Sequence, residues 1–231
     1  MCSSDLAVID VDPDQPKSLA DADERRRRMS LLHEDHVAPL TAFVERLRAE
    51  RGVGREIPYF DPLDGGVDAR ALLLLEAPGP KAVQSGFVSR NNPDETAKNF
   101  LLACRDAGLD RRQTVVWNIV PWYIGDGKKI RRAGVRDLHE GLPFLLARLI
   151  PMLHRLQAVV LIGGKADRAY AWIRPPYPNL RIFHCPHPSP VFVNRHPGNR
   201  TRVVGALAQV VLWLNSIEAD LGEGCCKLGD A

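Results

Sequence analysis

Residues 71–80, Ala-Leu-Leu-Leu-Leu-Glu-Ala-Pro-Gly-Pro, join a short apolar run to a proline-rich loop. The run Ala71–Leu75 is bounded by Asp68 and Pro78. A short apolar run between such residues is typical of a strand that is buried on both faces of a parallel sheet. The segment therefore predicts a buried strand that ends directly before the acidic residue Glu76.

On both sides of this strand, the chain alternates between helical and extended patterns. An amphipathic helix is predicted over Asp35–Glu50, and Asp94 caps another helix that Gly108 ends. Further strands are predicted at Thr114–Ile119, Ala158–Ile162 and Arg181–His184, and further helices at Val135–Leu149, Lys165–Trp172 and Thr201–Ile217.

This alternation predicts an α/β fold: a three-layer α/β/α domain with a central, mostly parallel four-stranded sheet. We expect a single domain over residues 29–217. In such sheets the ligand site lies beyond the carboxyl ends of the strands. A candidate site residue should therefore come directly after a strand.

The two ends of the chain differ from this pattern. Residues 1–28 are rich in Asp, Pro and Ser and end in four arginines, so we expect a disordered extension, with Met29 as an alternative starting residue. Residues 218–231 contain three glycines and few large apolar groups, and we expect a flexible tail.

The composition of the chain argues against a membrane protein and against a disulfide-rich protein. The formal net charge of the 231 residues is only +3, and no apolar run approaches the roughly 20 residues that span a bilayer. No secretory signal is evident, and the five cysteines form no C-x-x-C pair. We expect a monomer with reduced thiols in a cytosol of the bacterial type, without membrane contact.

Three loops follow predicted strands and carry polar side chains: Glu76–Pro80, Asn118–Tyr123 and Cys185–Pro190. Taken singly, each has an ordinary explanation, as a turn, a strand-end cap or an incidental histidine. A parallel sheet brings all three loops to one edge, however, and this convergence favours a shared site.

These loops resemble the motifs of the uracil-DNA glycosylase superfamily. Leu75–Gly79 matches the G-E-A-P-G motif of its iron–sulfur branch in four of five places, and His187–Pro190 reproduces H-P-S-P. Asn118 ends the middle strand, as in the superfamily. The stretches Gly86–Val88 and Leu161–Gly164 also match, so the resemblance covers about residues 70–205.

The departures from the iron–sulfur branch concern its cluster and its acidic residues. Pro121, Trp122 and Tyr123 occupy the place of a cluster cysteine, and no cysteine pair precedes the first strand. We therefore expect no iron–sulfur cluster, no metal and no organic cofactor. Ala77 replaces the residue that positions water in the cluster-free branch, and Lys81, Ala82 and Val83 replace further acids.

The resemblance implies hydrolysis of the glycosidic bond of uracil in DNA. His187 would act as a neutral imidazole that stabilises the departing uracil anion. Glu76 would hold the water or support the sugar cation, or alternatively bond loop amides. Asn118 would read the base edge, Phe87 would stack on the flipped base, and Ala77, Pro78 and Gly79 would complete its pocket. Gln84, Ser85 and backbone carbonyls are the other candidates for holding the water.

The DNA partner, single- or double-stranded, would be held by residues near the same loops. Ser189, Gly164 and Lys165 would contact phosphates, while Val191, Phe192 or Arg195 would fill the space left by the flipped base. Two basic stretches add phosphate contacts by their charge: Lys128, Lys129, Arg131, Arg132 and Arg136 in one, and Arg195, Arg200 and Arg202 in the other.

The sequence leaves two alternatives open and disfavours a third. The first is a glycosylase for another deaminated base such as hypoxanthine, since Gly79 leaves room for larger bases. The second is a non-catalytic binder of uracil or abasic DNA, which would need neither Glu76 nor His187. The third, an unrelated nucleotide-binding protein, lacks support because neither glycine-rich phosphate motif occurs.

Overall fold

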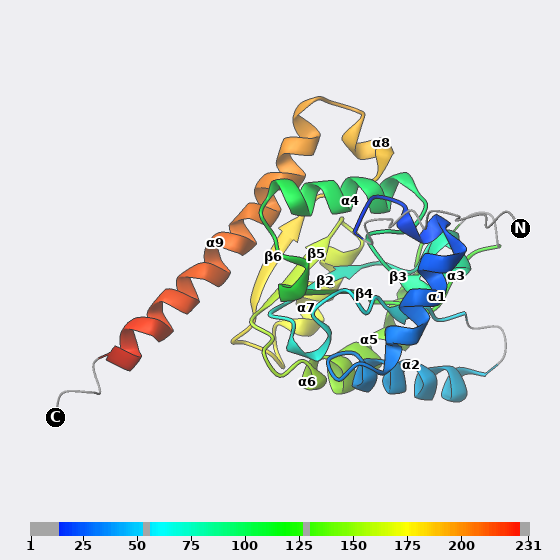
Figure 1. Ribbon diagram of the computed structural model, residues 1–231, viewed down its shortest axis with the longest axis horizontal. Coiled ribbons are helices and arrows are strands. Elements are labelled where there is room, and N and C mark those ends of the chain that lie inside the picture. The colour runs from blue at the N-terminus through cyan, green and yellow to red at the C-terminus, as the bar shows by residue number, and fades with distance from the viewer. Residues whose placement is uncertain (1–13, 53–55, 127–129, 227–231) are drawn as a thin grey trace, which may run out of the picture.

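The computed structural model of the chain describes residues 14–52, 56–126 and 130–226, with only the backbone described for 218–226. Its centre is a four-stranded sheet in the order β4-β2-β5-β6, in which every pairing is parallel (Figure 1). The strands are β2 (Ala71–Leu75), β4 (Thr114–Asn118), β5 (Ala158–Ile162) and β6 (Arg181–Cys185). The predicted fold class and the predicted strands are confirmed.

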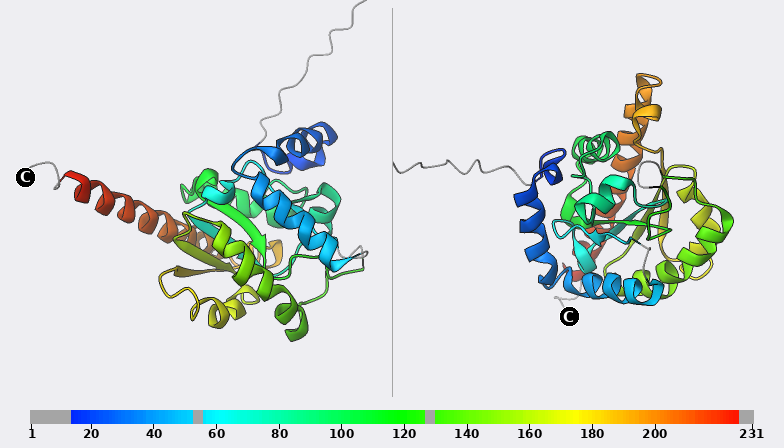
Figure 2. Two further views of the ribbon diagram at one scale, coloured as in Figure 1. Left: turned by 90° about the horizontal axis from the view of Figure 1, so that it is seen from below. Right: turned by 90° about the vertical axis from the view of Figure 1, so that its right-hand side faces the viewer.

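Helices cover both faces of the sheet. The connection from β2 to β4 runs through α4 (Glu95–Asp106), and the connection from β4 to β5 returns in the opposite direction through α5 (Val135–Phe144). Because parallel crossovers are right-handed, these two helices lie on opposite faces. The helix α9 (Gly198–Cys226) packs beside α4, and α2 (Ala38–Arg51) lies on the side of α5 (Figures 1 and 2).

The register of the strands aligns their carboxyl ends. Leu75 pairs with Asn118 across β2 and β4, and Ile162 pairs with Cys185 across β5 and β6. All residues of β4 and β5 are buried, as expected for strands that are covered on both faces. The loops that follow the four strands therefore begin side by side at one edge of the sheet.

One predicted helix is confirmed and two differ from the structure in detail. The Asp94 side chain accepts a hydrogen bond from Ala97 N, at 2.9 Å, and caps α4 as predicted. The helix predicted to reach Leu149 changes after α5 into a π-helical segment, where Pro143 has no N–H to donate. It ends in α6 (Ile150–Met152), and the helix predicted over Lys165–Trp172 is a 3-10 turn (Ala166–Ala169) followed by α7 (Tyr170–Ile173).

Short elements outside the predicted pattern complete the fold. A second, two-stranded parallel sheet pairs β1 (Tyr59–Phe60) with β3 (Phe87–Val88). The helices α3 (Pro80–Ser85) and α8 (Pro190–Val193) each start at a proline, in the loops after β2 and β6. Elements of two to six residues are too short to leave a periodic apolar pattern, so the sequence did not reveal them.

The structure corrects the expectation of a disordered extension for residues 14–28; residues 1–13 lie outside the described part of the chain. Helix α1 (Ala22–Ser30) packs on the domain, and Leu19 is buried with Leu32 and Phe87. The Arg28 side chain is completely buried. The low apolar content of this segment did not indicate that it is ordered, because the residue that holds it against the domain is a buried arginine paired with acidic side chains.

A buried ion-pair network holds α1 in place. Arg28 donates to Glu24 and to Asp61, and Arg111 donates to the same oxygen of Asp61 at 2.8 Å. Burial raises the pKa of Asp61, but the charges of Arg111 and Arg28 outweigh burial and lower it from 3.8 to about 2. Asp61 also accepts from the Ser89 hydroxyl, in the segment that follows β3. The network therefore links the N-terminal helix to the centre of the domain.

The flexible tail expected from residue 218 also differs from the structure. The backbone of α9 stays helical through Cys226, and this helix extends away from the rest of the fold (Figure 1). Extending an existing helix avoids the unfavourable nucleation step, which explains how it passes the glycines at 222 and 224. Residues 227–231 lie outside the described residues. Within the described parts of the chain, no helix combines the length and apolar character needed to cross a membrane.

We predict that Arg28→Met destabilises the fold by about 3 kcal/mol, because it leaves buried acids without a partner. The free energy of unfolding from urea titration measures this loss. Asp61 stabilises the wild type fully above pH 4, and this contribution is lost as the pH falls towards 2. In Arg28→Met the pKa of Asp61 should rise, so acid destabilisation should begin at a higher pH.

Arg26→Met is the matched control, since Arg26 lies on the same helix but is exposed, and Asp23, with which it pairs, is exposed too. We expect a change within about 0.5 kcal/mol for this variant. Equal stability of the two variants would show that α1 is not held by Arg28.

Candidate active site

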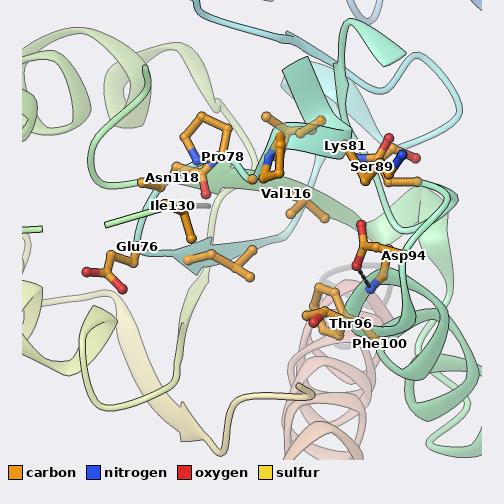
Figure 3. A pocket seen from close by; sticks show the side chains of 18 of the residues that line it. Glu76, Pro78, Lys81, Ser89, Asp94, Thr96, Phe100, Val116, Asn118 and Ile130 are labelled. Carbon is orange, nitrogen blue, oxygen red and sulfur yellow. Dashed lines mark hydrogen bonds between the residues drawn. The ribbon is translucent and has the colours of Figure 1, made fainter. Parts of the chain in front are cut away.

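A cavity of about 450 Å³ opens at the carboxyl edge of the sheet. It is bounded by the loops after β2, β4 and β6, by the segment after β3 and by the first turn of α4 (Figure 3). The side chains with polar or charged groups that line it are Glu76, Lys81, Ser89, Asn92, Asp94, Thr96, Asn118 and His187. The predicted convergence of three loops at one site is thus present in the structure.

The loop after β2 forms one wall of the cavity. Ala77, Pro78 and Gly79 all line it, as the sequence predicted for the base pocket. Ile119 N donates to Leu75 O and Val120 N to Glu76 O, which continues the pairing of β2 and β4 beyond the strands. A Cβ atom placed on Gly79 would meet no atom within 4 Å, so this wall leaves open space in front of the loop.

Glu76 lines the cavity and also braces a neighbouring loop. Its Oε1 accepts from Ala133 N at 2.6 Å and from Lys165 Nζ at 3.3 Å. These bonds match the loop-bonding alternative, while the ion pair with Lys165 places a carboxylate at the cavity wall. Glu76 therefore joins the segments that follow β2, β4 and β5.

Asn118 is the last residue of β4 and is only 2% exposed. Its Nδ2 atom is buried and has no hydrogen-bond partner among the described residues. A buried amide donor without a partner costs about 1–3 kcal/mol. Because Asn118 lines the cavity, a ligand with an acceptor atom can pair with this donor there.

His187 lies across the cavity in the loop after β6. Ser189 N donates to His187 Nδ1 at 3.2 Å, so in the neutral ring the proton is on Nε2. Burial lowers the pKa of His187 from its usual 6.5, although the charges of Glu76 and Asp94 act to raise it. The favoured form at neutral pH is therefore an uncharged ring that can donate from Nε2.

Two residues outside the predicted roles hold the His187 loop in place. Gly163 has a φ of +83°, and a Cβ atom there would lie 2.9 Å from His187 Cβ. Asn99 on α4 donates to Pro188 O at 3.1 Å. The sequence showed Gly163 only as part of a small-residue turn, and it contained no signal that Asn99 faces this loop.

The structure corrects the prediction that Phe87 stacks on the base. Phe87 is completely buried, packs with Leu19 and Leu32, and does not line the cavity. Its partners come from the N-terminal segment, which the sequence analysis treated as disordered. The neighbouring Val88 faces the cavity instead, and Phe100 of α4 supplies an aromatic ring to its wall.

The two alternative water-holding residues lie outside the cavity as well. Ser85 is buried, and its hydroxyl donates to Asn92 at 2.6 Å. Gln84 is exposed and accepts from Lys81 at 2.9 Å. Neither side chain lines the cavity.

The residues predicted to contact DNA follow the strands β5 and β6. Val191 is 84% exposed at the start of α8, while Phe192 is half-buried with the Arg202 guanidinium 5.6 Å from its ring. Arg195 and Gly164 are exposed, and Ser189 precedes α8. Lys165 pairs with Glu76, so its charge is directed to the cavity wall.

The two predicted basic stretches are only partly free of acidic partners. Lys128 and Lys129 lie outside the described residues. Arg131 makes two hydrogen bonds to Asp137, at 2.6 and 2.7 Å, and Arg200 pairs with Asp106. Arg132 and Arg136 are exposed, and neither has an ion-pair partner among the described residues.

The described residues do not fit a four-cysteine cluster. Pro121 and Trp122, which follow Asn118, are buried. Cys104 and Cys185 are free and buried, and burial raises the pKa of the Cys185 thiol to about 12. Within the part of the chain that the structure describes, no three His, Cys, Asp or Glu side chains are grouped to hold a metal ion.

A comparison with known protein families identifies the family of the chain. The family model described as the uracil DNA glycosylase superfamily matches residues 62–210, more than half of the chain. The chain belongs to this superfamily. It is therefore a DNA glycosylase of that family, which acts in base excision repair and binds DNA. A search of curated proteins found no match to the chain.

For this superfamily member, we predict that Gly163→Ala slows base release about a hundredfold, because the new methyl group would displace the His187 ring. Single-turnover kinetics on damaged DNA measure the effect. Gly108→Ala is the matched control: its φ of +69° imposes similar backbone strain, but a Cβ atom there meets nothing within 4 Å. Equal rates for both variants would show that Gly163 does not position His187.

Proposed function

We propose that the protein removes uracil from DNA by hydrolysing its glycosidic bond and leaves an abasic site. One observation carries this proposal: the unpaired Nδ2 donor of Asn118 and the neutral His187 donor line the same cavity. The first can recognise a flipped base, and the second can stabilise it as it leaves. A non-catalytic binder would need only the Asn118 donor.

Asn118 would select uracil by its hydrogen-bonding edge. Nδ2 donates to O4 of the base, and Oδ1 accepts from N3–H. Cytosine presents an amino group where uracil presents O4, so two donors would face each other. Leaving the buried Nδ2 unpaired opposes cytosine further, because recognition by buried polar groups discriminates strongly against a ligand that cannot pair with them.

His187 would stabilise the charge that develops in the reaction. As the C1′–N1 bond breaks, its electron pair moves to uracil and gathers partly on O2. The Nε2–H of His187 donates to that oxygen, in the manner of a preorganised oxyanion donor. A neutral donor suits a partly buried site, since a charged ring would require costly desolvation.

The sugar develops positive charge in the same step. Glu76 would support this cation electrostatically while Lys165 and Ala133 N hold its carboxylate in place. The DNA phosphates on either side of the flipped nucleotide carry further negative charge. The proposed hydrolysis therefore relies on side chains of the protein, on the DNA phosphates and on water.

The DNA strand would lie over the loops around the cavity. Ser189, Gly164 and Lys165 would contact phosphates near the flipped nucleotide, with Arg195 beyond them. The exposed Val191 is the best-placed side chain to fill the space left in the stack, with Phe192 packed beneath it. A single chain supplies all these groups, so the proposed active form is a monomer on single- or double-stranded DNA.

A second candidate substrate is hypoxanthine in DNA. The cavity of about 450 Å³ and the open space in front of Gly79 set no steric barrier against a purine. Hypoxanthine also presents a carbonyl oxygen beside an N–H group, which matches the donor and acceptor of Asn118. An excision assay with oligonucleotides that contain either base separates the two substrates.

The proposal is tested with oligonucleotides that contain uracil, hypoxanthine or a thymine mispair, in buffer with EDTA. We expect the wild type to release uracil, and His187→Ala to slow release by about a hundredfold or more with little loss of DNA binding. His184→Ala changes a histidine of β6 that does not line the cavity and that pairs with Asp167, so this variant should keep the wild-type rate. Release of hypoxanthine alone would replace uracil as the substrate, and no release of any base would reject a glycosylase.

We predict that Asn118→Asp slows uracil excision and raises the relative rate on cytosine, because a charged acceptor replaces the donor that faces O4. The measurement compares excision from strands that contain either base. Asn215→Asp, an exposed change on α9, controls for added negative charge. Unchanged rates on both bases in Asn118→Asp would remove this residue from base recognition.

A further inference from the structure

The topology places the start of α4 at the same edge as the base pocket. The connection that leaves the carboxyl end of β2 runs through α3 and β3 and then enters α4, which carries the chain back towards the start of β4. Asp94, its capping residue, lines the cavity together with Thr96, Ala97 and Phe100 of the first turns. Figure 3 shows Asp94 on the opposite side of the cavity from Glu76 and Asn118.

Asp94 differs from Glu76 in what already binds it. Glu76 is held by Lys165 and by Ala133 N. The Oδ1 of Asp94 accepts only from Ala97 N, and neither of its oxygens forms an ion pair with a cation among the described residues. Its charge nevertheless acts on the His187 ring across the cavity. Asp94 is therefore a fixed carboxylate with one oxygen available to a ligand.

The proposed reaction has a place for a polar group that binds the hydrolytic water. Ala77 has no polar side chain, and Gln84 and Ser85 do not line the cavity. Glu76 and Asn118 lie together on one side, where they would meet the base and the sugar. A nucleophile must approach C1′ from the side opposite the departing base, and Asp94 is the carboxylate on the other side.

We propose that Asp94 binds the hydrolytic water and directs it to C1′. This inference rests on the proposed glycosylase function. The C1′–N1 bond breaks, and its electron pair leaves with uracil, which His187 Nε2 stabilises by a hydrogen bond. The water oxygen then bonds to C1′, and its proton passes to the Asp94 carboxylate and on to solvent. The uracil anion takes up a proton from solvent, which balances the reaction.

Two variants separate the charge of Asp94 from its capping role. Asp94→Asn and Asp94→Ser both keep a good capping residue for α4 but remove the carboxylate. We expect each to slow single-turnover uracil excision about a hundredfold, the lower end of what a general base contributes. Affinity for uracil-containing DNA and the free energy of unfolding should stay near the wild-type values. Asp21→Asn, a cap change on α1 at a residue that does not line the cavity, is the control.

The second measurement is the choice of nucleophile in aqueous methanol. Capture of the sugar cation by methanol leaves a methyl glycoside that withstands hot alkali, whereas capture by water leaves an abasic site that alkali cleaves. The wild type should favour water strongly. Asp94→Asn and Asp94→Ser should shift the product ratio towards that of the two nucleophiles in solvent, which a purely structural role would not do.

The outcomes distinguish this inference from the function on which it rests. A wild type that releases no uracil overturns both. A wild type that releases uracil, with wild-type rates and product ratios in both Asp94 variants, overturns only the role of Asp94. Slower variants with an unchanged product ratio also overturn it, because the residue would then act on bond cleavage and not on the water.

Discussion

Parallel pairing of β2 with both β4 and β5 is the constraint on which the site depends. In an all-parallel sheet every strand ends at the same edge, and the pairing of Leu75 with Asn118 aligns two of these ends residue by residue. The backbone bonds after these strands extend that alignment into the loops. The same topology starts α4 at this edge, so the Asn118 amide, the His187 imidazole and Asp94 line one cavity.

The site combines features that oppose stability with features that support it. Asn118 buries an unpaired donor, Gly163 adopts a left-handed conformation, and His187 sits where burial disfavours its charge. Each is unfavourable in the free protein, and in the proposed function each would act on a base with carbonyl oxygens. The two strands β4 and β5 are completely buried, and β5 is wholly apolar, so they form a rigid support for these groups.

The residues that could be located from the sequence share one property: each lies at or just after the end of a predicted strand. The limits of β2 and β5 and the convergence of Glu76, Asn118 and His187 follow from apolar runs and parallel topology. Phe87, Arg28 and Asp94 could not be placed in the same way, since their surroundings come from segments distant in sequence. Phe87 turns towards Leu19, and Arg28 pairs with Asp61 across 33 positions. Asp94 was correctly predicted as a helix cap, but a capping pattern does not show which cavity the cap faces.

The N-terminal segment has a closer relation to the site than the limits of the family match indicate. That match begins at residue 62, whereas Arg28 and Asp61 precede it. Asp61 accepts from Ser89, which lines the cavity, and Leu19 packs against Phe87 beside the cavity-lining Val88. One wall of the cavity is thus backed by α1 through a buried ion pair. Because an ion pair without one partner is strongly unfavourable when buried, this backing is present only when the N-terminal segment is docked.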